Sequence, residues 1–381
     1  MSGGPLSHLK VLDLSRVLAG PWATQFFGDL GAQVLKIERP GQGDDTRSWG
    51  PPWFKDGAMS AYFSCANRNK QSLAVDFTHA EGAARIIELA SEADVVIENF
   101  KKGALAKYGL DYPSLKAVKP DLVYCSITGF GQTGPYAERA GYDALIQGMG
   151  GLMSITGEAG GEPMKVGVAV VDLFTGMYAA SGILAALAHR DRTGEGQHID
   201  VALFDVQAAM LANQAANYLA TGRAPKRLGN AHPSICPYQA FAAADGHLIL
   251  AVGNDDQFAK FCRIAGHPDL ADQAEFATNP ARVANRERLV GLLAEIFLLH
   301  PRAWWVEKLE AAGVPCGPIN DLAELFADPQ LLSRGMVLEQ DGLRMVGNPL
   351  KFSATPLPAP ASPPALGEHD GSGGWLDQAG E

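Results

Sequence analysis

The sequence predicts an α/β protein with a large domain built on a doubly wound, mostly parallel, Rossmann-like sheet and a smaller α/β domain. Short apolar runs of strand type alternate with helix-type segments through the first 130 residues. Strands that are separated by helices are typical of parallel βαβ units. After about residue 225 the chain changes character, because a hairpin pattern and several helices follow a linker rich in Pro, Gly and Asn.

The first 130 residues supply most of the predicted sheet. A helix is expected over 22–31, and a second helix over 79–93 is expected to begin at a capping box formed by Thr78 and Glu81. The predicted strands are short, apolar and separated by these helices, so they are expected to lie parallel. They cover residues 10–15, 32–38, 72–77, 94–99 and 121–127.

The rest of the large domain begins with a glycine-rich loop after Phe130. An apolar helix is expected from about residue 170 to 187, followed by a strand over 196–203. A single long helix is then predicted over 203–222, ending at Gly222.

The domain division follows from the change in composition. Residues 1–225 are predicted to form the large domain, to which residues 326–381 return, and residues 226–325 the small domain. The last part of the chain should contain a hairpin and then a Pro- and Gly-rich tail that contributes to no core. The small domain should contain a hairpin around an "ADG" turn and helices over 257–266, 280–299 and 302–313.

The composition excludes several classes of protein. The formal net charge of −11 argues against nucleic acid or an anionic membrane as a partner. The five cysteines include no C-x-x-C pair, which argues against a zinc site and favours free thiols in a reducing compartment. The N-terminus has no signal-peptide pattern. We therefore expect a cytoplasmic protein.

One segment, Val166–Leu187, approaches the length that crosses a membrane. It contains Asp172, Thr175, Ser181 and three glycines, and no aromatic or basic belt flanks it. A helix of this composition is not expected to span a bilayer.

Phosphate-binding and metal-binding motifs are not recognised in the sequence. It has no G-x-G-x-x-G between a strand and a helix, no P-loop, no H-E-x-x-H and no G-x-S-x-G. A phosphate-bearing ligand would therefore have to be bound by cations that are scattered along the chain. No bound metal and no permanently bound cofactor are expected.

Asp172 is the only charged residue between Val166 and Leu187, and it allows two interpretations. It could be an N-cap that accepts hydrogen bonds from the amides of Phe174 or Thr175. It could instead be a functional carboxylate, kept ionised by the helix dipole and poorly hydrated among apolar neighbours. The two interpretations are compatible, because one oxygen could cap the helix while the other faces a cleft.

Several sequence stretches, in order, resemble the class III CoA-transferases, the family that includes carnitine dehydratase and bile-acid-inducible F. They include "LKVLDLSRVLAGPWATQFFGDLGAQVLKIERPGQGDDTR", "NRNKQSLAVDF", "ADVVIENFKKGAL", "YCSITGFGQTGPY", "RAGYDALIQGMGGLMSITG" and "LGEH". The resemblance runs from about Leu6 to Asp370. It is strongest to the branch that contains succinyl-CoA:glutarate CoA-transferase.

The resemblance implies a covalent mechanism and a CoA site. In this family the aspartate that corresponds to Asp172 is the nucleophile, which forms anhydride and thioester intermediates without metal or ATP. Leu18 stands where formate-transferring members carry glutamine, which argues against formate or oxalate as a substrate. The residues that the resemblance places around CoA are Leu18, Ala19, Arg39, Asn99, Phe100, Lys107, Arg139 and Tyr142.

The sequence leaves two alternative functions open. The α-methylacyl-CoA racemases resemble this chain but carry histidine where it has Tyr142. Racemisation needs two proton-exchanging groups at the α-carbon, so the tyrosine favours a transferase. The second alternative is a non-catalytic acyl-CoA-binding protein, against which Asp172 in its fitting context argues.

The resemblance suggests succinyl-CoA as the CoA donor and glutarate, or a similar small dicarboxylate, as the acceptor. A dicarboxylate needs a cation or hydrogen-bond donors for its distal carboxylate. Arg227, Asn230 and His232 in "RLGNAHPS" are the candidates, although linker-turn roles explain them equally well. The resemblance also implies an interlocked homodimer, and the short C-terminal tail is a departure from the family that bears on the dimer contacts.

Overall fold

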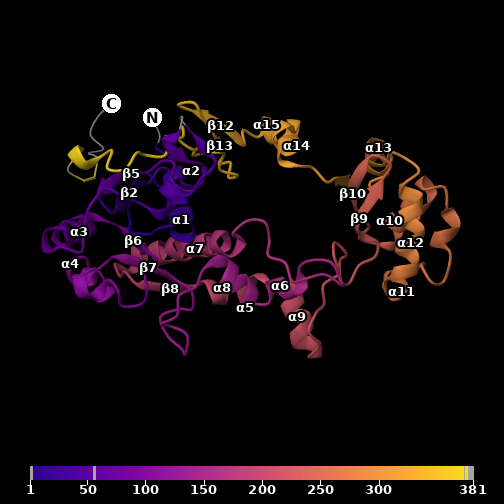
Figure 1. Cartoon of the computed structure of the whole chain (residues 1–381), viewed down its shortest axis with the longest axis horizontal. Coiled ribbons are helices and arrows are strands. Elements are labelled where there is room, and N and C mark those ends of the chain that lie inside the picture. Colours follow the sequence, from indigo (N-terminus) through magenta and orange to yellow (C-terminus); the bar gives the residue numbers. More distant parts are fainter. Residues whose placement is uncertain (1–2, 55–56, 373, 376–381) are drawn as a thin grey trace. The chain divides into compact units, whose positions relative to one another are not determined.

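The protein is described here by a computed structural model, which covers residues 3–54, 57–372 and 374–375. The chain forms two compact units (Figure 1). The large unit comprises Met1–Leu152, Lys165–Arg223 and Pro329–Glu381, and the small unit comprises Met153–Met164 and Ala224–Asp328.

The large unit is built on a six-stranded parallel sheet with the strand order β5-β2-β1-β6-β7-β8. This confirms the predicted α/β class and the parallel strands. The strands are short, and all but the edge strand β8 are almost entirely buried, as expected for a sheet covered on both faces. Their bounds are β1 Lys10–Asp13, β2 Gln33–Glu38, β5 Gln71–Ala74, β6 Val95–Glu98, β7 Val123–Thr128 and β8 His198–Ala202.

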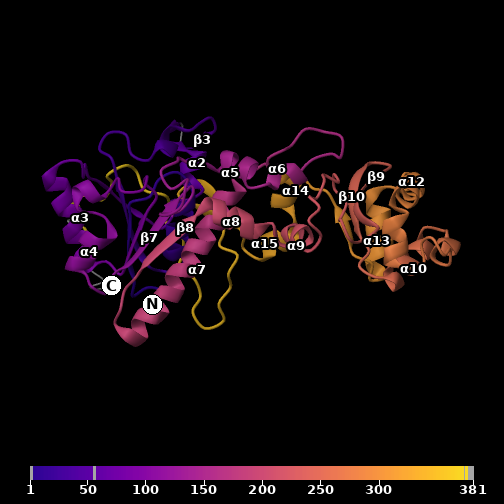
Figure 2. The ribbon, with the colours of Figure 1, turned by 90° about the horizontal axis from the view of Figure 1, so that it is seen from below.

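Helices cover both faces of the sheet (Figures 1 and 2). Alternate strand residues point to opposite faces. Val11 packs in the same core as α1 (Ala19–Asp29) and α7 (Val170–Thr193), whereas Leu12 packs in the core that contains residues of α3 and α4. The bounds of the latter two helices are Ala80–Glu92 and Tyr112–Val118.

The remaining elements of the large unit are short. They include a hairpin of β12 (Val337–Gln340) and β13 (Leu343–Val346), which confirms the hairpin expected in the last part of the chain. The others are η1 Asp45–Ser48, β3 Trp53–Phe54, β4 Met59–Ser60, α2 Ala61–Ser64, η3 Ala106–Tyr108, α5 Asp143–Met149, α8 Leu203–Met210, α9 Ala212–Thr221, α15 Pro329–Ser333 and η5 Asp370–Ser372, and α6 Leu152–Ile155 begins where this unit meets the small one.

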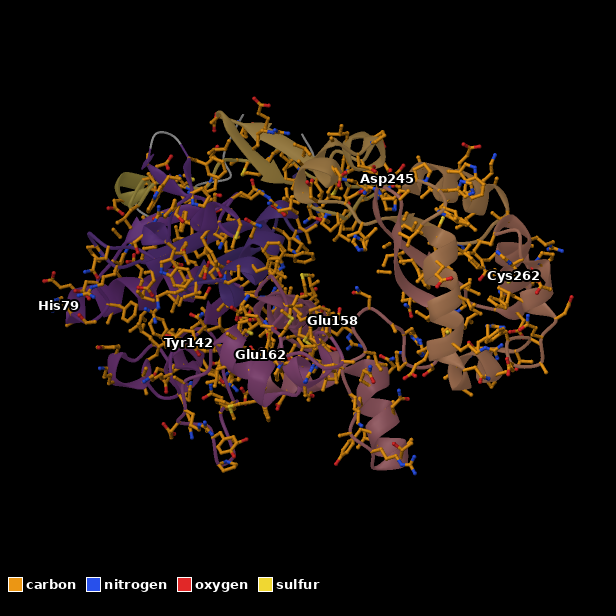
Figure 3. The ribbon with its side chains drawn as sticks, turned by 45° about the vertical axis from the view of Figure 1, so that its right-hand side comes forward. His79, Tyr142, Glu158, Glu162, Asp245 and Cys262 are labelled. Carbon is orange, nitrogen blue, oxygen red and sulfur yellow. The ribbon has the colours of Figure 1, made fainter. Side chains whose placement is uncertain are left out.

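The small unit has its own sheet and its own core. Its antiparallel sheet has the order β11-β10-β9, and Asp245 lies at the turn of the predicted β9–β10 hairpin (Figure 3). Helices pack on this sheet around Phe261, Phe297 and Trp305. The elements are β9 Tyr238–Ala243, β10 Gly246–Ala251, α10 Asp255–Ile264, η4 Pro268–Ala271, α11 Asn279–Ala284, α12 Arg286–Phe297, α13 Arg302–Ala311, β11 Cys316–Pro318 and α14 Leu322–Ala327.

Two predicted long helices are each broken in two. The helix expected over 203–222 is divided into α8 and α9 near Ala212, whose φ of 43° is left-handed. The helix expected over 280–299 is divided into α11 and α12 at Asn285. The Asn285 side chain donates to the carbonyl oxygen of Ala281 at 3.0 Å, and such a local bond competes with helical hydrogen bonding.

The predicted capping box of α3 is wrong. The N-cap residue is His79, whose side chain makes no capping hydrogen bond. Thr78 instead donates its hydroxyl to Asp76 Oδ1 at 2.6 Å. The threonine therefore closes a local turn before the helix and does not cap it.

The expectation that the C-terminal tail contributes to no core is also wrong in part. Pro363 and Pro364 are buried, and the tail runs along β5, the edge strand of the sheet. His369 donates its backbone amide to Ser72 O at 3.0 Å, and the Asp370 carboxylate accepts the Ala74 amide at 2.8 Å. The tail thus satisfies backbone groups of an edge that would otherwise be open for pairing.

Among the described residues, α7 is the single unbroken helix that is long and apolar enough to cross a membrane, judged by length and composition. It packs against α1, β7 and β8, and 44% of its most apolar 18-residue window is buried. These contacts are those of a core helix.

Two buried ion pairs lie beneath the loop that follows β1. Lys36 on β2 donates to Asp44 at 2.9 Å, and Lys70 donates to Asp13 at the end of β1 at 3.1 Å, with all four side chains buried. Burial by itself would lower the pKa of Lys36, but Asp44 and then Asp13 outweigh burial and raise it. Lys36 therefore stays charged in the interior.

The Lys36–Asp44 pair holds the loop Leu14–Leu18 in place. The ammonium donates to Ser15 O at 2.9 Å, and the Asp44 carboxylate accepts the Val17 amide at 3.2 Å. Val17 has a φ of 70°, a conformation that is costly for a β-branched residue. The carboxylate thus offsets backbone strain at the point where the chain turns from β1 into α1.

We expect Asp44→Ala to lower the free energy of unfolding by about 3–5 kcal/mol, because it leaves the Lys36 charge buried with one carboxylate fewer. Urea denaturation followed by circular dichroism measures the loss. Glu92→Gln is the control, because it removes the exposed Lys10–Glu92 pair and should cost about 1 kcal/mol or less. A loss for Asp44→Ala no larger than that of the control would contradict the role of the buried pair.

Candidate active site

The strand order reverses between β1 and β6, so the loops after these strands form the switch point of the sheet. In open α/β sheets, ligands bind outside the carboxyl ends of the strands at such a point. Asn99, which follows β6, joins the two loops. Its side chain accepts the Arg16 amide at 2.8 Å and donates to Arg16 O at 2.6 Å.

Asp172 lines a cavity of about 210 Å³ at this switch point, which we call the Asp172 cavity. Its wall combines the start of α1, the loops after β1, β6 and β7, and the first turn of α7. Four cationic side chains line it together with two carboxylates. The lining includes Arg16, Leu18, Ala19, Asp45, Asn99, Phe100, Lys101, Lys102, Gly129, Arg139, Gly141, Tyr142, Asp172 and Leu203.

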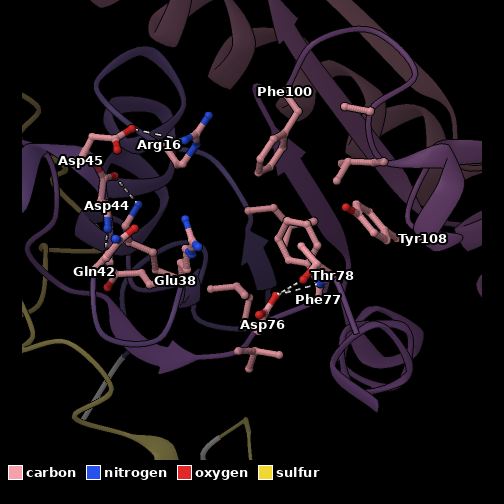
Figure 4. Close-up of a pocket in the computed structure, with 18 of the residues that line it drawn as sticks. Arg16, Glu38, Gln42, Asp44, Asp45, Asp76, Phe77, Thr78, Phe100 and Tyr108 are labelled. Atoms are coloured by element: carbon pink, nitrogen blue, oxygen red, sulfur yellow. Dashed lines mark hydrogen bonds and ion pairs between the residues drawn. The ribbon is translucent and has the colours of Figure 1, made fainter. Parts of the chain in front are cut away.

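A second cavity, of about 400 Å³, lies outside the ends of β2, β5 and β6, and we call it the Arg39 cavity. Figure 4 shows Phe77, Phe100 and Tyr108 on one side of it, and Arg16 with Asp44 and Asp45 on the other. Phe77 contacts both other rings edge-on, with ring centroids 5.7 and 5.6 Å apart. The Arg39 and Lys107 side chains also line this cavity.

The two cavities adjoin, because Arg16, Asp45 and Phe100 line both of them. All eight residues that the sequence analysis placed around CoA line one or the other. Arg39 and Lys107 line the Arg39 cavity, and Phe100 lines both. The other five, Leu18, Ala19, Asn99, Arg139 and Tyr142, line the Asp172 cavity.

The three residues suggested for the acceptor, Arg227, Asn230 and His232, belong to the small unit. Arg227 donates to the carbonyl oxygens of Glu158, at 3.3 Å, and Gly161, at 2.6 Å, and so holds the segment Met153–Met164 on which Glu158 lies (Figure 3). His232 lies against the Tyr238 ring, with centroids 5.4 Å apart. The Arg227 hydrogen bonds fit the interpretation that this residue stabilises a turn in the linker, which the sequence left open.

Asp172 is not an N-cap residue. The helix begins at Val170 after Ala169, and Asp172 lies within the first turn. The first-turn amides are capped instead by Asp143, whose Oδ2 accepts from Val171 N at 2.8 Å and from Asp172 N at 3.2 Å. The N-cap interpretation is therefore wrong. Asp172 does not cap the helix and instead lines the cavity.

The structure also opposes the expectation that the helix dipole keeps Asp172 ionised. The carboxyl group is half-buried, and burial, followed by the charge of Asp143, raises the pKa of Asp172 to about 7. Desolvation and a nearby like charge both disfavour the anion. Near neutral pH the residue therefore exists as a mixture of carboxylic acid and carboxylate.

A glycine sets the distance between the nucleophile helix and α1. A Cβ added to Gly176, one turn after Asp172, would lie 2.6 Å from Ala19 O and 3.1 Å from the Trp22 side chain. Real Cβ atoms essentially never lie 2.6 Å from a backbone oxygen, so a side chain at this position would force the two helices apart. The close contact brings the first turn of α7 against the start of α1.

Arg16, Asp143 and the two lysines that follow Phe100 were not identified from the sequence. Arg16 comes directly after β1, and the rule that ligands gather at the carboxyl ends of strands could have identified it. Asp143 lies in the "GYD" stretch, in which only Tyr142 was a candidate site residue. No local signal shows that Asp143 meets a helix that starts 27 residues later, at Val170.

Comparison with known proteins supports the resemblance. Residues 6–370 match the model of CoA-transferase family III. The chain is 53% identical over 374 residues to the succinate–glutarate CoA-transferase of Agrobacterium fabrum, covering 96% of this chain and 94% of the relative. It is 45% identical over 370 residues to the succinyl-CoA:glutarate CoA-transferase of Homo sapiens, covering 96% and 84%.

A solved structure is similar as well. The crystal structure of a CaiB/BaiF family protein from Brucella suis aligns with a TM-score of 0.89 and 53% identity, over 97% of this chain and 98% of that one. The earlier resemblance, drawn from sequence stretches alone, is thus confirmed along nearly the whole chain. The protein belongs to CoA-transferase family III.

Proposed function

We propose that this enzyme transfers CoA from succinyl-CoA to glutarate, or to a similar small dicarboxylate, with Asp172 as the covalent nucleophile. The observation that carries the proposal is the position of Asp172 in a cavity at the switch point of the sheet, beside a second cavity that Arg39 and Lys107 line. The names of the relatives from Agrobacterium fabrum and Homo sapiens support the two acids.

The two adjoining cavities suggest how CoA is bound. The Arg39 cavity offers aromatic faces for the adenine ring and the cations Arg39 and Lys107 for the phosphates. The pantetheine arm would pass Arg16 and Phe100, which line both cavities, and bring the thioester to Asp172. The Arg39 cavity is also lined by the carboxylates Glu38, Asp44, Asp45 and Asp76, so phosphate binding there would depend on where Arg39 and Lys107 lie and not on a net positive charge of the cavity.

The exchange then runs in two halves. A carboxylate oxygen of Asp172 bonds to the thioester carbonyl carbon, the C–S bond breaks, and CoA leaves as a thiolate. The thiolate attacks the Asp172 carbonyl carbon of the resulting mixed anhydride, and succinate leaves as a carboxylate. Glutarate next attacks the aspartyl thioester and expels the thiolate, which attacks the glutaryl carbonyl and releases the Asp172 carboxylate. No proton is gained or lost overall.

The start of α1 can assist these steps. The first amides of a helix have no acceptor within the helix, and Leu18 provides no side-chain cap. Ala19 lines the cavity, so its amide could stabilise negative charge that develops on a carbonyl oxygen near Asp172. A neutral anhydride or thioester is stable only where water is largely excluded.

The proposal includes an assignment for the acceptor. Arg227, Asn230 and His232 would recognise the distal carboxylate of a dicarboxylate. Arg139 is an alternative group for binding the distal carboxylate, because it lines the Asp172 cavity. Its Cζ atom lies 4.5 Å from the centroid of the Tyr136 ring. Tyr142, which is 70% exposed, stands where racemases carry histidine, and this favours transfer over racemisation.

The remaining parts of the proposal concern assembly and location. We infer that residues 226–325 act as a separate domain and that the chain forms an interlocked homodimer. Phe174, Met177 and Tyr178 of α7 are 44%, 39% and 50% exposed in this chain, an apolar surface that a second copy could cover. We also propose that the enzyme is cytoplasmic and has no permanently bound cofactor.

Asp172→Ala should reduce the exchange rate by more than about 10³-fold while CoA still binds, because it removes the nucleophile. A tryptic digest isolates Val166–Arg190, in which Asp172 is the sole side-chain carboxyl. After incubation of the unaltered enzyme with succinyl-CoA, mass spectrometry should find hydroxylamine-sensitive CoA on this peptide. Turnover of even a few per cent in the variant, or an unmodified peptide, would refute the covalent role.

Arg39→Ala and Lys107→Ala should each raise the KM for succinyl-CoA by about 10-fold or more and change kcat less, because phosphate contacts persist through the reaction. Initial rates at varied succinyl-CoA measure the effect. Lys116→Ala is the matched control, since this exposed lysine on α4 lines neither cavity. An unchanged KM in both variants would remove the Arg39 cavity from the CoA site.

Arg227→Ala should lower kcat/KM for glutarate by about 10-fold or more and leave that for pentanoate, which lacks the distal carboxylate, within about twofold. Arg139→Ala tests the alternative assignment in the same assay. Arg223→Ala, in the linker, is the control. Equal losses for both acids would show that the variant harms catalysis in general and would contradict a role in recognising a dicarboxylate.

A further inference from the structure

Asp143, the first residue of α5, accepts two hydrogen bonds from the start of the nucleophile helix and one from Gln147 on its own helix. Its Oδ2 accepts the amides of Val171 and Asp172. Its Oδ1 accepts Gln147 Nε2 at 2.5 Å, and the Oε1 of the same glutamine accepts the Val166 amide at 2.9 Å. Gln147 is fully buried.

These contacts replace a cap that the helix lacks. Ala169 has no side chain that can accept a hydrogen bond, and the first amides of a helix need acceptors. Asp143 and Gln147 together bind the segment from Val166 to Asp172 at both of its ends. The orientation of the nucleophile is therefore set by a different helix, α5, through backbone contacts.

We propose that Asp143 is a positioning residue that both orients Asp172 and, by its negative charge, disfavours the free Asp172 carboxylate relative to its neutral covalent adducts. This rests on the proposed nucleophilic role of Asp172. In the anhydride and in the thioester, Asp172 carries no charge, so its repulsion by Asp143 is relieved when the adduct forms and returns when the adduct is released. The charge thus promotes the covalent half-reaction.

The other charged groups around Asp172 come from several elements. The loops contribute the cations Arg16, Lys101, Lys102 and Arg139, and η1 contributes Asp45. On α2, burial, followed by the charge of Asp172, raises the pKa of Tyr62 to about 12, so its hydroxyl stays neutral. The residues that α1 and α8 contribute to the cavity, such as Ala19 and Leu203, are uncharged. Of the carboxylates, Asp143 contributes to the raised pKa of Asp172, after burial.

Asp143→Asn tests the charge while keeping an oxygen that can cap α7. Only the Asp172 carboxylate attacks, so kcat/KM should fall as the pH decreases below about 7 in the unaltered enzyme. Removing the neighbouring charge lowers the pKa of Asp172 and moves this acidic limb to lower pH. We expect the ratio of kcat/KM at pH 6 to that at pH 8 to rise by about threefold or more, a shift of about half a pH unit.

A second readout does not depend on turnover. With succinyl-CoA alone at pH 8, the fraction of the Val166–Arg190 peptide that carries CoA should fall by about threefold in Asp143→Asn, because the free carboxylate is no longer repelled. Two controls accompany both measurements. Gln147→Met removes a hydrogen bond to Asp143 but leaves the negative charge of Asp143 in place. Asp191→Asn removes one negative charge from the far end of α7, about 28 Å along the helix from Asp172.

The outcomes separate this inference from the proposed function. If Asp143→Asn shifts the limb and Gln147→Met and Asp191→Asn do not, the charge of Asp143 acts on Asp172. If the acidic limb does not move in Asp143→Asn while the Val166–Arg190 peptide still carries CoA, the inference is overturned and Asp172 remains the nucleophile. If the peptide carries no CoA in the unaltered enzyme, both the inference and the proposed function are overturned. Asp143→Ser keeps a capping hydroxyl if the asparagine variant does not fold, and failure of both to fold would assign Asp143 to folding and overturn the inference.

Discussion

The buried pair between Lys36 and Asp44 holds together the part of the chain on which the site depends. An ammonium and a carboxylate removed from water are tolerated only when they are paired and hydrogen-bonded. Here the carboxylate also accepts the amide of Val17, whose left-handed backbone would otherwise cost about 1–3 kcal/mol. The loop that this pair restrains supplies Arg16 and leads directly into the first turn of α1.

The nucleophile is placed by contacts that are independent of this pair. Gly176 lets α7 approach α1 closely, and Asp143 caps α7 from α5. The result is a carboxylate at the border between the core and a cavity, with a second carboxylate nearby. Such a group makes the fold less stable as the pH rises from about 4 to about 7, because the folded state binds the Asp172 proton more tightly than the unfolded chain does. Active sites commonly carry this kind of cost.

The strands were predictable from the sequence because a buried parallel strand is a short apolar run, and such runs are bounded by polar turns. The two long helices were predicted as unbroken because neither contains proline or an internal glycine at its break. Ala212 and Asn285 interrupt them through a left-handed backbone and a local side-chain hydrogen bond. The tail was expected to lie outside any core from its composition alone, yet it satisfies the edge of β5.

The sequence by itself determined which carboxylate matters, because one charge in an apolar helical run is conspicuous and the flanking stretches match a known family. It also determined the order of strands and helices, since these follow from local patterns of apolar residues. Only the tertiary structure decided that Arg16 and Asn99 join at the switch point, that Asp143 rather than Asp172 caps α7, and that Asp172 holds its proton up to about pH 7. The proton affinity of a carboxyl group depends on its burial and on charges within a few ångströms, and folding brings those neighbours from distant parts of the chain.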